Sequence, residues 1–79
     1  MIHKKGVRLF VTFHTTADAM AFERACRTAG VDGRLAPVPR SITSDCGIAW
    51  ETEPPLRDAL ADIIKRERLN TAGICEREV

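Results

Sequence analysis

Hydrophobic residues recur along this chain with two different spacings, every second residue and every third or fourth residue. The order in which these spacings follow one another is the strongest constraint on its fold. Residues 7–13 alternate between two faces and are rich in β-branched and aromatic side chains, which is typical of a strand. In residues 16–29 apolar side chains recur every three or four positions, which indicates an amphipathic helix. The complete pattern predicts strands at 7–13, 34–38, 48–52 and 71–77 and helices at 16–29 and 55–68.

The resulting order is strand, helix, strand, strand, helix, strand. It suits the ferredoxin-like α+β fold, a four-stranded antiparallel sheet with both helices on one face. A chain of 79 residues is too short for two cores, so residues 1–79 are expected to form a single domain. Pro37 and Pro39 cannot donate ladder hydrogen bonds, which places the second strand at a sheet edge.

Local signals mark the ends of the first helix. Thr15 and Asp18 stand three positions apart, as in a capping box, and Gly30 suits a left-handed stop. Met20 falls on the polar side of this helix. The side chains expected to face the helix-side core are Val7, Leu9, Val11, Phe13, Ala21, Phe22, Ala25, Cys26, Ala29, Ile48, Trp50, Leu56, Ala59, Leu60, Ile63 and Ile64.

Charge and hydropathy exclude several classes of protein. Lys and Arg number 12 against 11 Asp and Glu, and a net charge of +1 gives no general attraction to nucleic acid or membranes. An RNA-binding sheet would also need exposed aromatic side chains, and only Phe10 is a candidate. No apolar run approaches the roughly 18 residues of a membrane span, and none has the form of a signal peptide. We therefore expect a cytoplasmic protein.

Three cysteines, without a C-x-x-C pair, indicate free thiols rather than a disulfide scaffold, a zinc site or an iron–sulfur cluster. A copper chaperone would carry C-x-x-C between the first strand and helix, where this chain has His14, Thr15 and Thr16. We expect neither a metal nor a cofactor. Cys26 lies on the apolar face of a helix and is expected in the core, whereas Cys75 is either a second thiol or simply a strand residue.

Cys46 lies in a polar loop, residues 40–47, that precedes the third strand. In the expected topology this loop shares one end of the sheet with the start of the first helix, so Cys46 is predicted near His14, Thr15 and Thr16, with residues 66–70 reaching the same end. The amino end of that helix and Arg40 would favour a thiolate.

Other loop residues act on the same sulfur. The hydroxyls of Ser41, Thr43 and Ser44 can donate to it, and Gly47 lets a partner approach. Asp45 acts in the opposite direction, as a negative neighbour. The alternative is a structural turn in which Cys46 is a small, half-buried hydrophobic residue. His14 is either a base for Cys46 or a solvated loop residue.

Two stretches resemble one family. They are Val11-Thr12-Phe13 with Asp18-Ala19-Met20, and residues 34–49, which contain Pro37-Val38-Pro39-Arg40 followed by Ser and Thr residues and Cys46-Gly47. The chain resembles the selenium/sulfur carrier protein-like family of small bacterial domains over about residues 7–77. Cys46 matches the motif cysteine of that family, and Pro37, Pro39 and Arg40 match its Pro-x-Pro-Arg. Asp45 and Cys75 depart from its usual pattern.

The resemblance implies a carrier without catalytic activity. Its cysteine would accept sulfur or selenium, as a persulfide or selenosulfide, from a donor enzyme such as a cysteine desulfurase and pass it to an acceptor protein. The competing function is an interaction or regulatory module that works through an open sheet face. Phe10, Thr12, Ala49 and Cys75 would line that surface, and a homodimer through it is compatible with either function.

Overall fold

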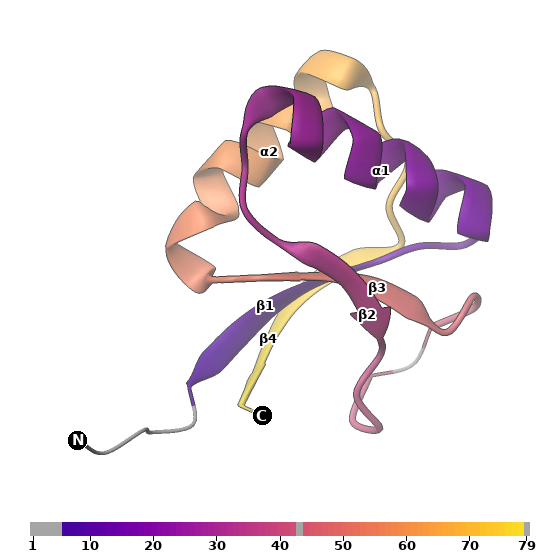
Figure 1. The fold of residues 1–79 in the computed structure, drawn as a ribbon. Coiled ribbons are helices and arrows are strands. Elements are labelled where there is room, and N and C mark those ends of the chain that lie inside the picture. The colour runs from indigo at the N-terminus through magenta and orange to yellow at the C-terminus, as the bar shows by residue number, and fades with distance from the viewer. Residues whose placement is uncertain (1–5, 43, 79) are drawn as a thin grey trace.

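The computed structural model describes residues 6–42 and 44–78, which form an α+β fold of the ferredoxin-like type. Both helices lie on one side of the sheet (Figure 1). The predicted elements are confirmed with shifts of one or two residues at most ends. In chain order they are β1 Val7–Thr12, α1 Thr16–Ala29, β2 Arg34–Pro37, β3 Ile48–Thr52, a 3₁₀ turn Pro54–Leu56, α2 Arg57–Glu67 and β4 Gly73–Glu78.

The sheet is antiparallel throughout and has the order β2-β3-β1-β4. The edge position predicted for β2 is confirmed. The Val38 N–H donates to the carbonyl oxygen of Gly47 at 3.1 Å. Because hydrogen-bonded pairs alternate along an antiparallel ladder, Pro37 falls at a position whose N–H would point away from β3. Its missing donor therefore costs no ladder bond and leaves the exposed edge less able to pair with another strand.

The first helix begins and ends as its residues predict, whereas the second begins later than expected. The Thr15 hydroxyl accepts a hydrogen bond from the Asp18 N–H at 3.1 Å, and Gly30 ends α1 in the left-handed conformation at φ +76°. The prolines before α2 form a 3₁₀ turn rather than its first α-helical turn, so α2 starts later than expected. Ala29, Ala59 and Val7 were expected to face the core but are exposed.

The main core fills the space between the sheet and the helices. Phe22 is fully buried, and its ring centroid lies 5.3 Å from that of Phe13 and 5.8 Å from that of Trp50. Trp50 thus faces the helices as predicted, and Met20 is 52% exposed on the outer side of α1. The buried residues of this cluster are Leu9, Val11, Phe13, Ala19, Phe22, Cys26, Trp50, Leu60 and Ile63.

The expectation of an open outer sheet face is wrong. The chain after β2 turns below the sheet, on the side opposite the helices (Figure 1). Ile42 from this segment packs on Phe10 and Ala49, which are 2% and 0% exposed, and Val38 and Cys75 pack around them. Thr12 is also buried, and its hydroxyl donates to the Gly73 carbonyl oxygen at 3.3 Å. The surface proposed for the interaction module is therefore already occupied by the chain itself.

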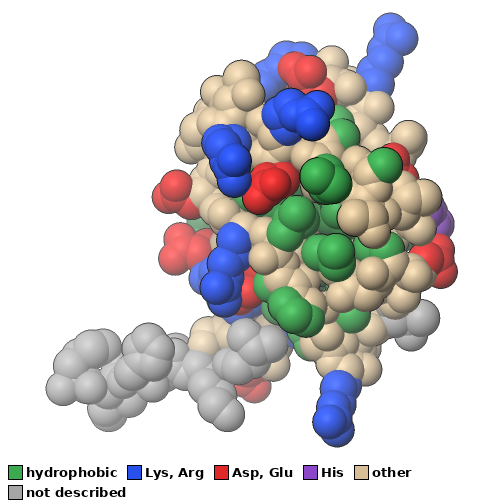
Figure 2. Space-filling model, turned by 45° about the vertical axis from the view of Figure 1, so that its right-hand side comes forward, with side chains coloured by type: hydrophobic (Ala, Val, Ile, Leu, Met, Phe, Trp, Pro, Cys, Tyr) green, Lys and Arg blue, Asp and Glu red, His purple; other side chains and the backbone are tan. Residues whose placement is uncertain are grey.

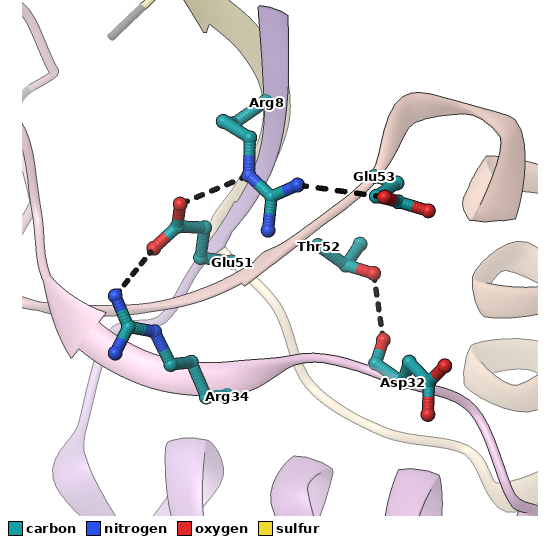
Figure 3. Close-up of polar contacts among 6 residues, drawn as sticks. All are labelled: Arg8, Asp32, Arg34, Glu51, Thr52 and Glu53. Atoms are coloured by element: carbon teal, nitrogen blue, oxygen red, sulfur yellow. Dashed lines mark hydrogen bonds and ion pairs between the residues drawn. The ribbon is translucent and has the colours of Figure 1, made fainter. Parts of the chain in front are cut away.

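The rest of that face carries ion pairs instead of apolar side chains. Glu51 lies between two arginines, with carboxylate oxygens 3.0 Å from Arg8 Nε and 3.7 Å from an Arg34 guanidinium nitrogen (Figure 3). Positive and negative side chains also intersperse around a central group of hydrophobic ones on the face seen in Figure 2. The face seen in Figure 2 consequently presents no large surface of one charge.

In the described ranges, neither helix has the length and hydrophobicity that a membrane span requires.

Candidate functional site

Residues 38–47, here called the rim loop, wrap around one end of the sheet; residue 43 lies outside the described part. The first half of the rim loop covers the outer face through Val38 and Ile42. The second half returns to the helix side, where Cys46 packs against the main core. The Val38–Gly47 hydrogen bond closes the base of the loop. The rim loop thus packs on both faces of the sheet and places the Cys46 thiol at the end of the sheet where the two faces meet.

The Cys46 side chain is partly buried rather than enclosed. Its thiol donates to the carbonyl oxygen of Ile48, with sulfur and oxygen 3.5 Å apart. Gly47 adopts φ +75°, a conformation that favours glycine, and a Cβ at that position would meet no atom within 4 Å. The position that a side chain at residue 47 would occupy, next to Cys46 in the chain, is therefore open. Sequence reasoning missed the Ile48 carbonyl, because no residue type signals a backbone acceptor.

The predicted meeting of the rim loop with the start of α1 is confirmed. His14 Nδ1 lies 2.8 Å from a carboxylate oxygen of Asp45, across 31 positions of sequence. Both side chains are well exposed. This contact occupies one ring nitrogen of His14. It also gives the carboxylate of Asp45, the residue before Cys46, a hydrogen-bonding partner.

The remaining predicted site residues are arranged less directly. Thr15 uses its hydroxyl as the α1 cap, and Thr16 is exposed at the first helical position. Arg40 and Ser41 are exposed. The Ser44 hydroxyl oxygen is buried and has no hydrogen-bond partner. Thr43 lies outside the described residues. From the segment 66–70, Leu69 packs against the same core cluster as Cys46.

The three thiols occupy three different environments. Cys26 is 0% exposed on α1, and burial raises its pKa from 9.0 to about 11. Cys75 is partly buried and faces the outer cluster beneath the rim loop, so it lies on the other side of the sheet from Cys46. No three His, Cys, Asp or Glu side chains in the described ranges gather as metal ligands. Of the three thiols, Cys46 is the one that lies in a loop and is only partly buried.

Fold and site together define a small ferredoxin-like domain with a thiol at the rim of its sheet. A family profile described as "putative Se/S carrier protein-like" matches residues 8–76. The chain belongs to this family, which confirms the resemblance in its sequence. Neither the curated proteins nor the solved structures gave a match.

Proposed function

We propose that this protein carries sulfur or selenium on the thiol of Cys46 and has no catalytic activity of its own. Membership of a carrier family supports a carrier role. The observation that selects the residue is the contrast between Cys46, which is partly exposed in the rim loop, and Cys26, which the core encloses. A group handed between two proteins must be reached from outside twice, and a rim position permits this.

The transfer needs no external oxidant. The Cys46 thiol first gives up its hydrogen bond to Ile48 and releases its proton to solvent. The thiolate then attacks the terminal sulfur of a persulfide on the donor enzyme. A new S–S bond forms on Cys46, the S–S bond of the donor breaks, and the donor thiolate leaves. An acceptor thiolate repeats the exchange on the terminal sulfur, and a selenium atom would travel by the same steps as a selenosulfide.

The neighbours of Cys46 would serve this exchange by position and charge. Gly47 carries no side chain that could obstruct a partner approaching the loop beside Cys46. The unpaired Ser44 hydroxyl is a donor available to a terminal sulfur or selenium anion, and Arg40 adds positive charge in the same loop. His14 pairs with the carboxylate of Asp45, while Thr15 and Thr16 form the amino end of α1 at this rim.

The partners follow from the chemistry. The donor is an enzyme that forms a persulfide, such as a cysteine desulfurase, and the acceptor is a protein with an attacking thiol. We place the exchange in the cytoplasm, where thiols stay reduced. Nucleic acid and membranes are not part of the proposal.

Mass spectrometry of the protein after incubation with a cysteine desulfurase and free cysteine tests the proposal. We expect a mass increase of one sulfur atom, located on the peptide that contains Cys46 and removed by a reductant. Cys75→Ser is the matched control, because it removes the other partly buried thiol and should retain the adduct, whereas Cys46→Ser should lose it. An adduct on Cys75 alone, or none on either thiol, would contradict the proposal.

A further inference from the structure

The two edge strands of the sheet differ in how well they can pair with another strand. β2 carries Pro37, which has no N–H on the outer side of that edge. β4 lies beside β1 at the other edge, has six residues and contains no proline (Figure 1). In residues 6–42 and 44–78 no strand pairs with the outer side of β4. An edge of this kind is a template for a further strand.

The ladder hydrogen bonds show which backbone groups of β4 face outward. The hydrogen bond that closes the base of the rim loop lies in register with the β2–β3 ladder. Alternation carried from it across β3 and β1 assigns the N–H and C=O of Cys75 to bonds with β1. The same groups of Ile74 and Glu76 therefore point to the free edge. In agreement, the Glu76 carbonyl oxygen accepts a hydrogen bond from the Arg77 side chain at 2.8 Å.

The side chains of β4 select one register for pairing with an identical strand. Antiparallel pairing about a two-fold axis places residues of the same sheet face opposite each other. An axis at Glu76 or at Arg77 would oppose like charges, which is unfavourable. With the axis at Cys75, Ile74 faces Glu76 of the other copy, and Arg77 faces Gly73, which has no side chain. This register gives the longest overlap in which no like charges are directly opposite.

We propose that β4 pairs with β4 of a second copy about a two-fold axis at Cys75 and joins the two sheets into one. Ile74 and Glu76 exchange backbone hydrogen bonds between the copies, so that the Ile74 N–H replaces the Arg77 side chain at the Glu76 carbonyl. The two Cys75 residues then form a non-hydrogen-bonded pair, with Cα atoms about 4.5 Å apart. Cysteines whose Cα atoms lie about 4.4–6.8 Å apart can form a disulfide.

Sedimentation and thiol crosslinking test this dimer, in a Cys46→Ser background that keeps the carrier site out of the result. Since edge pairing buries little surface, the reduced protein should form a reversible dimer with a dissociation constant of about 0.1–1 mM. Diamide takes up two hydrogen atoms from two thiols and leaves one disulfide. We expect the peptide containing Cys75 to be linked to its own copy, at twice the mass. No dimer at a protein concentration of about 2 mM would overturn the proposal.

Two variants of one exposed position separate the backbone pairing from the side chain. Glu76→Pro removes an N–H from the free edge and leaves the bonds to β1 intact, whereas Glu76→Ala removes the same side chain and keeps that N–H. Glu76→Pro should slow the crosslinking of Cys75 about tenfold relative to Glu76→Ala. Equal crosslinking rates in the two variants would contradict pairing through this edge.

Moving the thiol by one position tests the register. In a variant with Cys75→Ser and Glu76→Cys, the thiol at position 76 faces Ile74 of the other copy rather than its own counterpart. It should crosslink at least about tenfold more slowly than Cys75 does, because its counterpart lies beyond the range of a disulfide. Random collision predicts the reverse, since position 76 is more exposed than position 75. Crosslinking at position 76 as fast as at position 75 would show that the assigned register is wrong.

Discussion

Cys26 and Cys46 belong to or pack on the same core cluster, yet the fold encloses the first thiol and leaves the second partly exposed. Cys26 lies in the middle of α1, where the sheet and neighbouring side chains leave it 0% exposed. Cys46 reaches the cluster from the rim loop and is only partly buried. Both are small thiols with an apolar contact. Position relative to the edge of the sheet, rather than residue type, therefore sets how exposed each thiol is.

The largest expected effect comes from opening the region around Cys26. Phe22→Ala removes a fully buried ring between Phe13 and Trp50 and should cost about 3–5 kcal/mol of unfolding free energy. Urea denaturation followed by Trp50 fluorescence measures the loss. Iodoacetamide should then modify Cys26 much faster, since its modification depends on opening of the structure, and the contrast with Cys46 should shrink.

Met20→Ala provides the control for this prediction. Met20 is 52% exposed on the same helix, so its loss should change the unfolding free energy little and leave Cys26 protected. If Cys26 in the unchanged protein reacts as fast as Cys46, the comparison between an enclosed and a rim thiol fails.

A smaller effect is expected from pH. Because burial raises the pKa of Cys26 to about 11, the thiol ionises at lower pH in the unfolded chain, near 9.0, than in the folded protein. The stability contribution of the neutral thiol is fully present below pH 9 and is lost as pH rises toward 11, by about 2–3 kcal/mol. Urea midpoints between pH 8 and about 11 measure this loss. Cys26→Ala should show a shallower decline, and an equal decline in both proteins would contradict the assignment.

The smallest effect concerns the rim. His14 and Asp45 are well exposed, so Asp45→Asn should change the unfolding free energy by less than about 1 kcal/mol. It should nevertheless speed alkylation of Cys46, because a negative charge next to the attacking sulfur is removed. Comparative alkylation rates at neutral pH measure this, with Asp62→Asn, a distant exposed carboxylate on α2, as the control. Slower alkylation in Asp45→Asn would show that the His14 contact holds Cys46 in its reactive position.

Much of the fold follows from local pattern. The alternation at 7–13 and the apolar spacing in the two helices predicted the elements, and the capping role of Thr15 and the stop at Gly30 are confirmed. The pattern could not show that Ile42 covers Phe10 and Ala49, because a single apolar residue in a polar loop has no period that reveals its partner. The pattern also did not show that Ala59 is exposed, since helical spacing does not fix how far the buried face of a helix extends around it.

For the candidate site, residue types and spacing were enough to predict the reactive groups: one loop cysteine before a glycine, charged and hydroxyl neighbours, and a family motif around them. They also predicted the order of strands and helices, because the spacing of hydrophobic residues differs between the two. The packing of the sheet and helices was needed to show which face each half of the rim loop covers, that His14 contacts Asp45, and that the indole N–H of Trp50 lies unpaired beside Gly33. These contacts join residues distant in sequence, and they depend on how the sheet and helices pack rather than on any local preference of the chain.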